Sequence, residues 1–177
     1  TYTYGREEGD FHAEHIQIGG GEITFDLVSP LGNIPGIRLG VPIAINIENG
    51  SGAMALAQLS GATGDEIRDG MATFRGVDRR FDIRLKTDKV VYISDYAHHP
   101  AEIRQSILSI KQLYEGRRIK AIFQPHLYTR TRDFYTDFAA ALSLLDDVVI
   151  APIYPAREHP IPRVTSALIY DNLRPGI

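Results

Sequence analysis

Acid, phenol and imidazole groups gather in one short run, Asp95-Tyr96-Ala97-His98-His99-Pro100. The run follows the apolar stretch Val90 to Ile93, which is typical of a fully buried strand. Pro100 suits the first turn of a helix, so the run is predicted to connect a strand to a helix. Parallel sheets bind ligands in loops of this kind. The run is therefore a candidate small-molecule site, although adjacent histidines also occur as helix caps and surface residues.

A second run has the same setting: Gln124-Pro125-His126-Leu127-Tyr128-Thr129-Arg130-Thr131-Arg132 follows the predicted strand Ile119 to Phe123. It supplies guanidinium, imidazole and hydroxyl groups, which together favour an anionic small molecule. A guanidinium offers a planar fork that matches a carboxylate or a phosphate. Residues that could act as such clamps are Arg80, Arg130 and Arg132.

Each arginine also has a structural interpretation. Arg80 stands beside Arg79 and could belong to a solvated charged pair, because exposed ion pairs contribute only about 0–1 kcal/mol. Arg130 could pair with Asp133 or Asp137 on the helix that follows it. The residues alone leave these alternatives open.

The elements that must position these groups fall into two kinds. Up to about residue 87 the pattern is mixed, with strands predicted at 11–18, 23–27, 33–39 and 81–85. A helix is predicted over 43–59, although its two glycines weaken it. A capping-box pattern, Thr63 with Glu66, predicts the start of a second helix.

From about residue 88 short apolar strands alternate with amphipathic helices. The stripe Ile103, Ile107, Ile110 and Leu113 predicts one helix after Pro100. A second helix, capped by Thr131, is predicted from Phe134, Phe138 and Leu142, and a strand follows at 148–150. This alternation predicts an α/β fold with a mostly parallel, Rossmann-like sheet. We therefore divide the chain into a domain at 1–87 and a domain at 88–177.

Composition narrows the class of protein. The 177 residues are 44% hydrophobic and 23% charged, with a net charge of -3 and no cysteine. These values indicate a folded globular chain, and they give no electrostatic footprint for nucleic acid or anionic membrane. No apolar run approaches the roughly 20 residues of a membrane-spanning helix. The charge and the lack of a long apolar run therefore predict no nucleic-acid partner and no membrane partner. The histidines have no recognised metal-ligand spacing, so we also predict no metal ligands.

Several motifs fall in an order that resembles the Mur ligase family, and within it the member that adds alanine. The motifs are Gly76-Val77-Asp78-Arg79-Arg80-Phe81, the run from Asp95 to Pro100, Phe123 to Thr131, and the loop Ile153 to Ile161. Because independent motifs match in sequence over most of the chain, the resemblance is specific. It implies the end of a mixed central ATP-binding domain followed by the start of a carboxyl-terminal α/β domain.

The resemblance implies nucleotide contacts for five residues. Asn46 and Asn49 occupy the positions of two family asparagines near the adenine and phosphates. Arg80 would meet the ATP phosphates, Asp95 the nucleotide sugar and Tyr96 the adenine. The cofactors implied are ATP and Mg²⁺.

The resemblance also implies an alanine pocket lined by His98, His126 and Arg130, with Arg80 and His98 as catalytic residues. The full enzyme would couple L-alanine to UDP-N-acetylmuramate through an acyl phosphate. That step belongs to peptidoglycan synthesis, cell-wall biogenesis, cell shape and cell division, in the cytoplasm. Its partners are therefore small molecules: UDP-N-acetylmuramate, L-alanine and ATP.

Some features depart from the family pattern. Ile45 stands where the family usually has histidine, which weakens the expectation of a metal contact there. Leu127 replaces an arginine of many members, and Arg157 replaces a small residue. The chain contains no G-x-x-x-x-G-K-[ST] loop to cradle phosphates and begins at Thr1. We therefore expect it to be part of a longer protein and to be inactive alone.

Two alternative functions stay open. The related ligase that returns a murein tripeptide to the same nucleotide sugar would differ in the stretch Pro125 to Arg130. A non-catalytic binding module could also retain the ligase fold.

Overall fold

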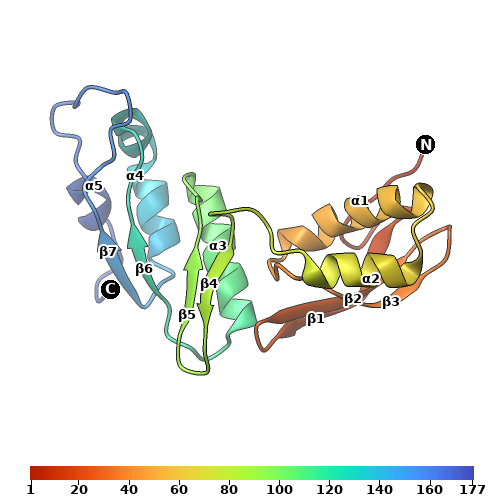
Figure 1. The fold of residues 1–177 in the computed structure, drawn as a ribbon. Coiled ribbons are helices and arrows are strands. Elements are labelled where there is room, and N and C mark those ends of the chain that lie inside the picture. Colours follow the sequence, from red (N-terminus) through yellow and green to blue (C-terminus); the bar gives the residue numbers. More distant parts are fainter. The chain divides into compact units, whose positions relative to one another are not determined.

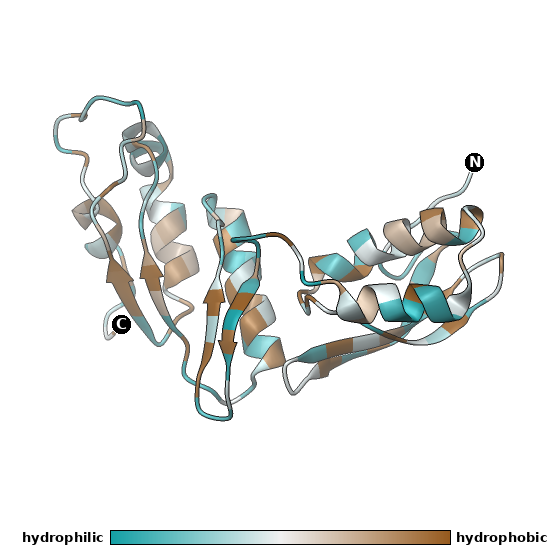
Figure 2. Cartoon of the chain, viewed as in Figure 1, coloured by the Kyte–Doolittle hydropathy of each residue, from teal (hydrophilic) through white to brown (hydrophobic).

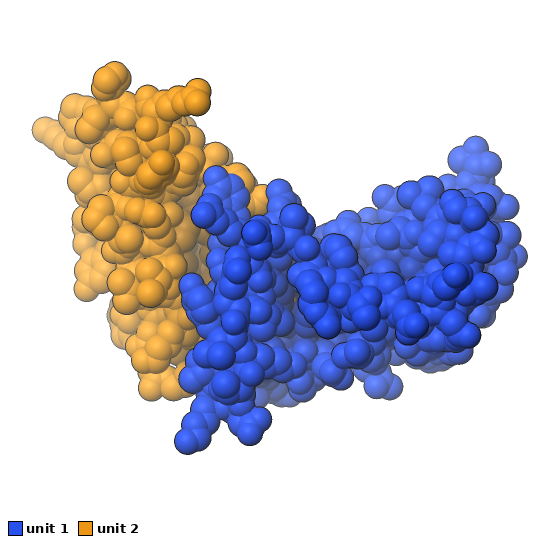
Figure 3. Space-filling model, viewed as in Figure 1, with its two compact units in different colours: residues 1–96, 112–115 blue, residues 97–111, 116–177 orange.

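The computed structural model describes residues 1–177 and divides them into two compact units (Figures 1 and 3). The first unit comprises residues 1–96 and 112–115, and the second comprises 97–111 and 116–177. The elements in chain order are β1 (His12–Gly19), β2 (Glu22–Val28), β3 (Ile34–Arg38), α1 (Ile45–Leu59), α2 (Gly64–Thr73), β4 (Asp82–Lys86), β5 (Val91–Ser94), α3 (Pro100–Leu113), β6 (Lys120–Phe123), α4 (Tyr128–Leu142), β7 (Asp147–Ile150) and α5 (Ala167–Tyr170). None of these helices is long and apolar enough to cross a membrane.

The first unit contains an antiparallel sheet in the order β1-β2-β3. Alternate residues of β2 are buried, because successive side chains of a strand point to opposite faces. Ile23, Phe25 and Leu27 are at most 2% exposed and form the centre of this core. The alternation read from the sequence is therefore confirmed for this strand.

Helix α1 continues through both of its glycines. A Cβ on Gly50 would lie 2.9 Å from Cε of Met71, and one on Gly52 would lie 2.8 Å from the ring of Tyr4. Glycine weakens a helix by about 1 kcal/mol relative to alanine. Here the missing side chains admit close neighbours, which accounts for a helix that propensity alone disfavours.

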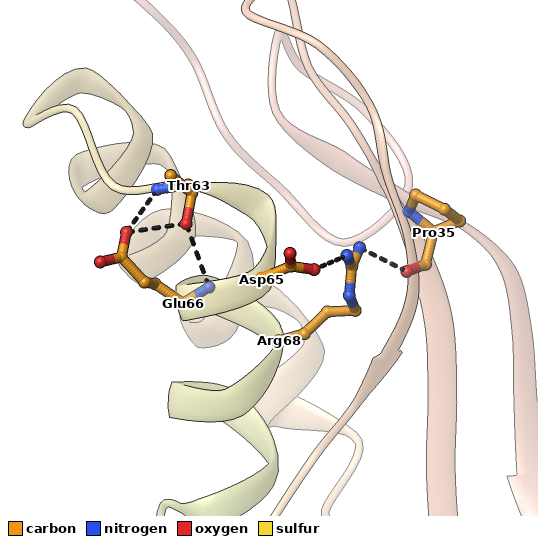
Figure 4. Close-up of polar contacts among 5 residues, drawn as sticks. All are labelled: Pro35, Thr63, Asp65, Glu66 and Arg68. Atoms are coloured by element: carbon orange, nitrogen blue, oxygen red, sulfur yellow. Dashed lines mark hydrogen bonds and ion pairs between the residues drawn. The ribbon is translucent and has the colours of Figure 1, made fainter.

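Helix α2 begins with the predicted capping box (Figure 4). The backbone N–H of Glu66 donates to Oγ1 of Thr63, and the backbone N–H of Thr63 donates to Oε2 of Glu66 at 2.8 Å. Arg68 pairs with Asp65 and also donates to the carbonyl oxygen of Pro35 at 3.4 Å. This contact ties the first turns of α2 to strand β3.

Strands β4 and β5 form an antiparallel hairpin. The prediction of a fully buried strand at Val90 to Ile93 is wrong, because Val90 is 53% and Tyr92 is 58% exposed. A two-stranded hairpin covers its residues on one face at most, so alternate side chains remain open to solvent.

The second unit contains the parallel pair β6 and β7, whose apolar character stands out in Figure 2. This ladder confirms the predicted parallel sheet, and the whole chain has the predicted mixture of helices and strands. Its core is formed by side chains from α3, β6, α4 and the segments after them: Ile103, Ile107, Phe123, Phe138, Ala139, Ala141, Leu142, Leu145 and Ile169.

Helix α4 starts earlier than predicted. Its N-cap is Leu127, so Thr131 lies inside the first turn, where its hydroxyl donates to the carbonyl oxygen of Leu127 at 2.9 Å. Thr131 is fully buried, and the predicted role of this residue as the cap is wrong. The helix is kinked at Phe134, whose ring packs on the ring of His99 with centroids 5.2 Å apart.

Candidate functional site

Arg80 is presented on a turn of unusual backbone geometry. The residues on either side of it, Arg79 and Phe81, have φ angles of +63° and +46°. Side chains rarely adopt this left-handed region, and such residues persist only where their surroundings hold them. The Phe81 ring, 3% exposed, anchors the turn, whereas Arg80 is exposed and makes no ion pair. An open guanidinium on a held turn suits an anionic ligand.

The predicted nucleotide residues Asp95 and Tyr96 hold that same turn. The backbone N–H of Tyr96 donates to the carbonyl oxygen of Arg79 at 2.5 Å, and Oδ1 of Asp95 accepts from the backbone N–H of Phe81 at 3.4 Å. The Tyr96 side chain is 51% exposed. The structure thus brings Arg80, Asp95 and Tyr96 together at one end of the β4–β5 hairpin.

Asn46 and Asn49 lie on the same side of the first turns of α1. The Asn46 amide donates to the carbonyl oxygen of Val41 at 3.1 Å, and the Asn49 amide donates to Oδ1 of Asn46 at 3.3 Å. Asn46 therefore ties the first turn of the helix to the segment that precedes it. Asn49 is exposed.

His98 and His99 directly precede α3, and Glu102 in its first turn holds both of their backbone N–H groups. Oε2 of Glu102 accepts from the backbone N–H groups of His98 and His99 at 3.0 and 3.2 Å. These bonds, led by that from His98, hold the pKa of Glu102 below its ordinary value. The Nδ1 of His98 lies 3.5 Å from Oε2 of Glu102. Nδ1 of His99 accepts from the backbone N–H of Ala101 at 3.3 Å.

His126 is fixed by the loop that follows β7. Its ring stacks on the ring of Tyr154, with centroids 5.3 Å apart and an interplanar angle of 21°. The backbone N–H of Leu127 donates to the carbonyl oxygen of Tyr154 at 2.9 Å, and that of Tyr154 donates to the carbonyl oxygen of Pro125 at 2.8 Å. The loops after two parallel strands therefore run together, as expected at the carboxyl edge of such a sheet.

Arg130 and Arg132 differ sharply in their partners. Arg132 is bidentate to Asp133, with Nε to Oδ1 at 2.7 Å and Nη2 to Oδ2 at 3.2 Å. Arg130 forms no ion pair, and its Nη1 is buried without a hydrogen-bond partner. A buried donor left unpaired costs about 1–3 kcal/mol, more when it is charged. Arg130 therefore has a guanidinium nitrogen that lacks an acceptor within the chain.

Sequence reasoning missed Glu158 as an individual residue. Its Oε1 accepts from the Thr129 hydroxyl at 2.5 Å, and its Oε2 accepts from the Thr129 backbone N–H at 3.0 Å. These bonds hold the pKa of Glu158 below its ordinary value, with the hydroxyl bond as the largest cause. The only sequence signal was its place in the loop Ile153 to Ile161 that resembles the family.

Contacts bring the predicted residues of the first unit together in two groups. Asn46 lies with Asn49, and Arg80 lies with Asp95 and Tyr96, all in the first unit. His98, His126 and Arg130 belong to the second unit. No three His, Asp or Glu side chains converge in a way that could hold a metal ion.

Comparison with known proteins gives the site its context. Residues 79–176 match the family described as Mur ligase, glutamate ligase domain. The chain is 72% identical over 176 residues to a UDP-N-acetylmuramate–L-alanine ligase of Phocaeicola vulgatus, covering 99% of this chain and 38% of that protein. It is 51% identical over 171 residues to the ligase of that name from Porphyromonas gingivalis, covering 97% of this chain and 38% of the relative. The chain thus spans about 38% of the length of these curated relatives.

Solved structures agree with the sequence relatives. The UDP-N-acetylmuramate–alanine ligase of Thermotoga maritima superimposes with a TM-score of 0.78 at 28% identity, covering 97% of this chain and 36% of that one. A folylpolyglutamate synthase of the same organism gives 0.74 at 18% identity over 93% of this chain and 38% of that one, which shows a shared fold alone. The resemblance read from the motifs is confirmed: this chain belongs to the Mur ligase family.

Proposed function

We propose that this chain supplies part of the active site of a ligase that joins L-alanine to UDP-N-acetylmuramate at the expense of ATP, in peptidoglycan synthesis. The observation that carries the proposal is the unpaired, buried Nη1 of Arg130. Arg130 lies one turn into a helix that begins beside His126, in a stretch that resembles the alanine-adding member of the family. An amino acid brings the carboxylate that this guanidinium lacks.

Each side chain has a distinct task in the proposed reaction. Bound ATP would supply a γ-phosphoryl group to the muramate carboxylate, with ADP as the leaving group. The alanine amine would then displace phosphate from that activated carboxyl group, forming the amide and losing a proton. Arg130 holds the alanine carboxylate, so the amine stays free and oriented. His126 and His98 line the same pocket. Arg80 stabilises the charge that develops on the transferring phosphoryl group.

The nucleotide contacts are part of the same proposal. Asp95 would meet the ribose and Tyr96 the adenine, while Asn46 and Asn49 would lie near the base and the phosphates. The open guanidinium of Arg80 and the half-exposed ring of Tyr96 suit phosphates and a base. Mg²⁺ belongs to the family's chemistry, but this chain offers no converging set of donors for it, and no step above depends on the ion.

A hybrid ligase tests the proposal. In the hybrid, the matching segment of the Phocaeicola vulgatus ligase is replaced by this chain, to which it is 72% identical. We expect the hybrid to release ADP only when UDP-N-acetylmuramate and L-alanine are both present, and to form the amide product. A folded hybrid that forms no product would refute the proposal.

The same assay separates the alternatives. Replacing L-alanine with the murein tripeptide tests the recycling ligase, which should prefer the peptide. A non-catalytic module would give a folded hybrid with neither activity. The proposal also places the boundary between the two family domains between residues 87 and 88. It places the action of the ligase in the cytoplasm.

A further inference from the structure

Helix α4 receives its N-terminal cap from a distant part of the chain. The first backbone N–H groups of a helix have no helical partner and need an acceptor. Residue Leu127 occupies the N-cap position, has φ of +76°, and offers no side-chain acceptor. Glu158 takes that place, binding the backbone N–H and the hydroxyl of Thr129 with its two carboxylate oxygens. The backbone N–H of Tyr128 also contributes to the lowered pKa of Glu158.

This cap does more than complete a helix. It is one of several contacts that join the loop after β7 to the loop after β6. The others are the hydrogen bond from the backbone N–H of Leu127 to the carbonyl oxygen of Tyr154 and the stacking of the His126 ring on the Tyr154 ring. The capped residue, Thr129, directly precedes Arg130. The Glu158 carboxylate therefore fixes the first turn of α4. This turn contains Arg130, and His126 lies just before it in the sequence.

The negative charge of Glu158 also bears on Arg130. The Arg130 charge contributes to the lowered pKa of Glu158, yet the two side chains form no ion pair. Because the carboxylate is taken up by Thr129 and the helix N-terminus, it does not satisfy the buried Nη1 of Arg130. The guanidinium thus has no carboxylate partner within the chain.

We propose that Glu158 is a positioning residue for the amino-acid site: it locks the first turn of α4 so that Arg130 and His126 hold the carboxylate of the incoming amino acid in one fixed place. The inference rests on the proposed function. It adds a residue that touches no reacting atom and acts through Thr129. A geometric error of about 1 Å in such a support can cost on the order of a hundredfold in rate.

The hybrid ligase provides the test, with steady-state kinetics for L-alanine and for ATP. In Glu158→Gln, the amide keeps the size of the side chain but loses the charge and turns an N–H toward a donor. We expect KM for L-alanine to rise about tenfold, the size of one lost charge-assisted hydrogen bond, and KM for ATP to change by less than about twofold. Glu115→Gln, at an exposed glutamate, is the matched control and should leave both constants unchanged.

A second pair of variants protects the test against simple misfolding. Thr129→Val removes the hydroxyl bond and should raise KM for L-alanine about threefold, whereas Thr129→Ser keeps the bond and should behave as the parent. Because Glu158 acts through Thr129, the double variant Glu158→Gln with Thr129→Val should be no worse than Glu158→Gln alone. If Glu158→Gln does not fold, a difference between Thr129→Val and Thr129→Ser in alanine KM still supports the role, and equal values overturn it.

The outcomes separate the two claims. An active hybrid in which Glu158→Gln leaves alanine KM unchanged, even with a lower melting temperature, overturns the positioning role and leaves the proposed function intact. Equal rises in both KM values also overturn it, because they indicate general damage. A folded hybrid without ligase activity refutes the proposed function, and the positioning role with it.

Discussion

Arg130→Lys in the hybrid ligase is the sharpest test of the amino-acid site. Lysine keeps the positive charge but replaces a planar fork by a point charge, so one of two hydrogen bonds to the alanine carboxylate is lost. A hydrogen bond to a charged group contributes about 1.5–3 kcal/mol, which corresponds to about a ten- to hundredfold rise in KM for L-alanine. KM for ATP should stay within about twofold, because the proposed nucleotide residues are others.

The structure adds a prediction about stability that a purely structural role for Arg130 would reverse. Its Nη1 is buried and unpaired, so the ligand-free chain carries a penalty of about 1–3 kcal/mol for that donor. Arg130→Met removes the donor and keeps much of the apolar stem. Urea unfolding of the 177-residue chain should therefore give an unchanged or higher free energy of unfolding, while the hybrid loses alanine binding.

Arg132→Lys is the matched control, since Arg132 is already bidentate to Asp133 and exposed. Its alanine KM should stay within about twofold of the parent, because exposed pairs contribute little. A normal alanine KM in Arg130→Lys would refute the clamp assignment. A loss of more than about 1 kcal/mol of stability in Arg130→Met would also refute it. Such a loss would indicate that Arg130 makes a stabilising interaction in the ligand-free chain.

Further predictions concern the other site and the fold. Arg80→Ala in the hybrid should lower kcat more than it raises KM for ATP, by on the order of 3 kcal/mol in the barrier, and an unchanged kcat would make Arg80 a simple binding residue. Gly40→Ala should destabilise the chain by about 1–3 kcal/mol in urea unfolding, because its Cβ would lie 2.1 Å from a backbone oxygen after α2. Gly70→Ala, with open space around it inside α2, should instead stabilise by about 0.5–1 kcal/mol; equal effects would contradict the packing argument. The pKa of Glu102 is lowered in the folded chain, so its stabilising effect is complete above about pH 4.5, the ordinary glutamate value, and is lost as pH falls through the folded pKa. Melting temperatures from pH 7 to pH 3 should therefore fall less steeply in Glu102→Gln than in the parent.

Local patterns predicted the elements whose stability is local or one-faced. The alternation in β2 marks a strand with one buried face, and the stripe of Ile103 and Ile107 marks the buried face of α3. The pair Thr63 and Glu66 predicted a capping box that the structure contains, since all of its groups lie within one turn. In these cases the residues that interact are close in sequence, so their spacing carries the structural information.

Contacts between distant residues left no such pattern. The sequence predicts that Thr131 caps α4, because Thr131 is a nearby residue whose side chain can accept from the helix start. The acceptor instead comes from Glu158 in a later loop. The exposed side of β5 was missed because a short apolar run reads alike whether one face or both are covered. Arg79 and Phe81 have left-handed backbone angles although neither is glycine, so their residue types do not indicate this geometry.

The candidate residues around Arg80 in the first unit and around Arg130 in the second share one physical arrangement. In each, a guanidinium without a protein partner lies next to backbone that other residues hold in place. Asp95 and Tyr96 hold the turn around Arg80, and Glu158 holds the helix start before Arg130. An anion-binding group that paired with the protein would have to break that pair to bind its ligand, so function favours leaving the charge free and using other carboxylates to fix the backbone. This explains why Glu158 and Asp95 accept hydrogen bonds from backbone amides and form no ion pair with the neighbouring arginines.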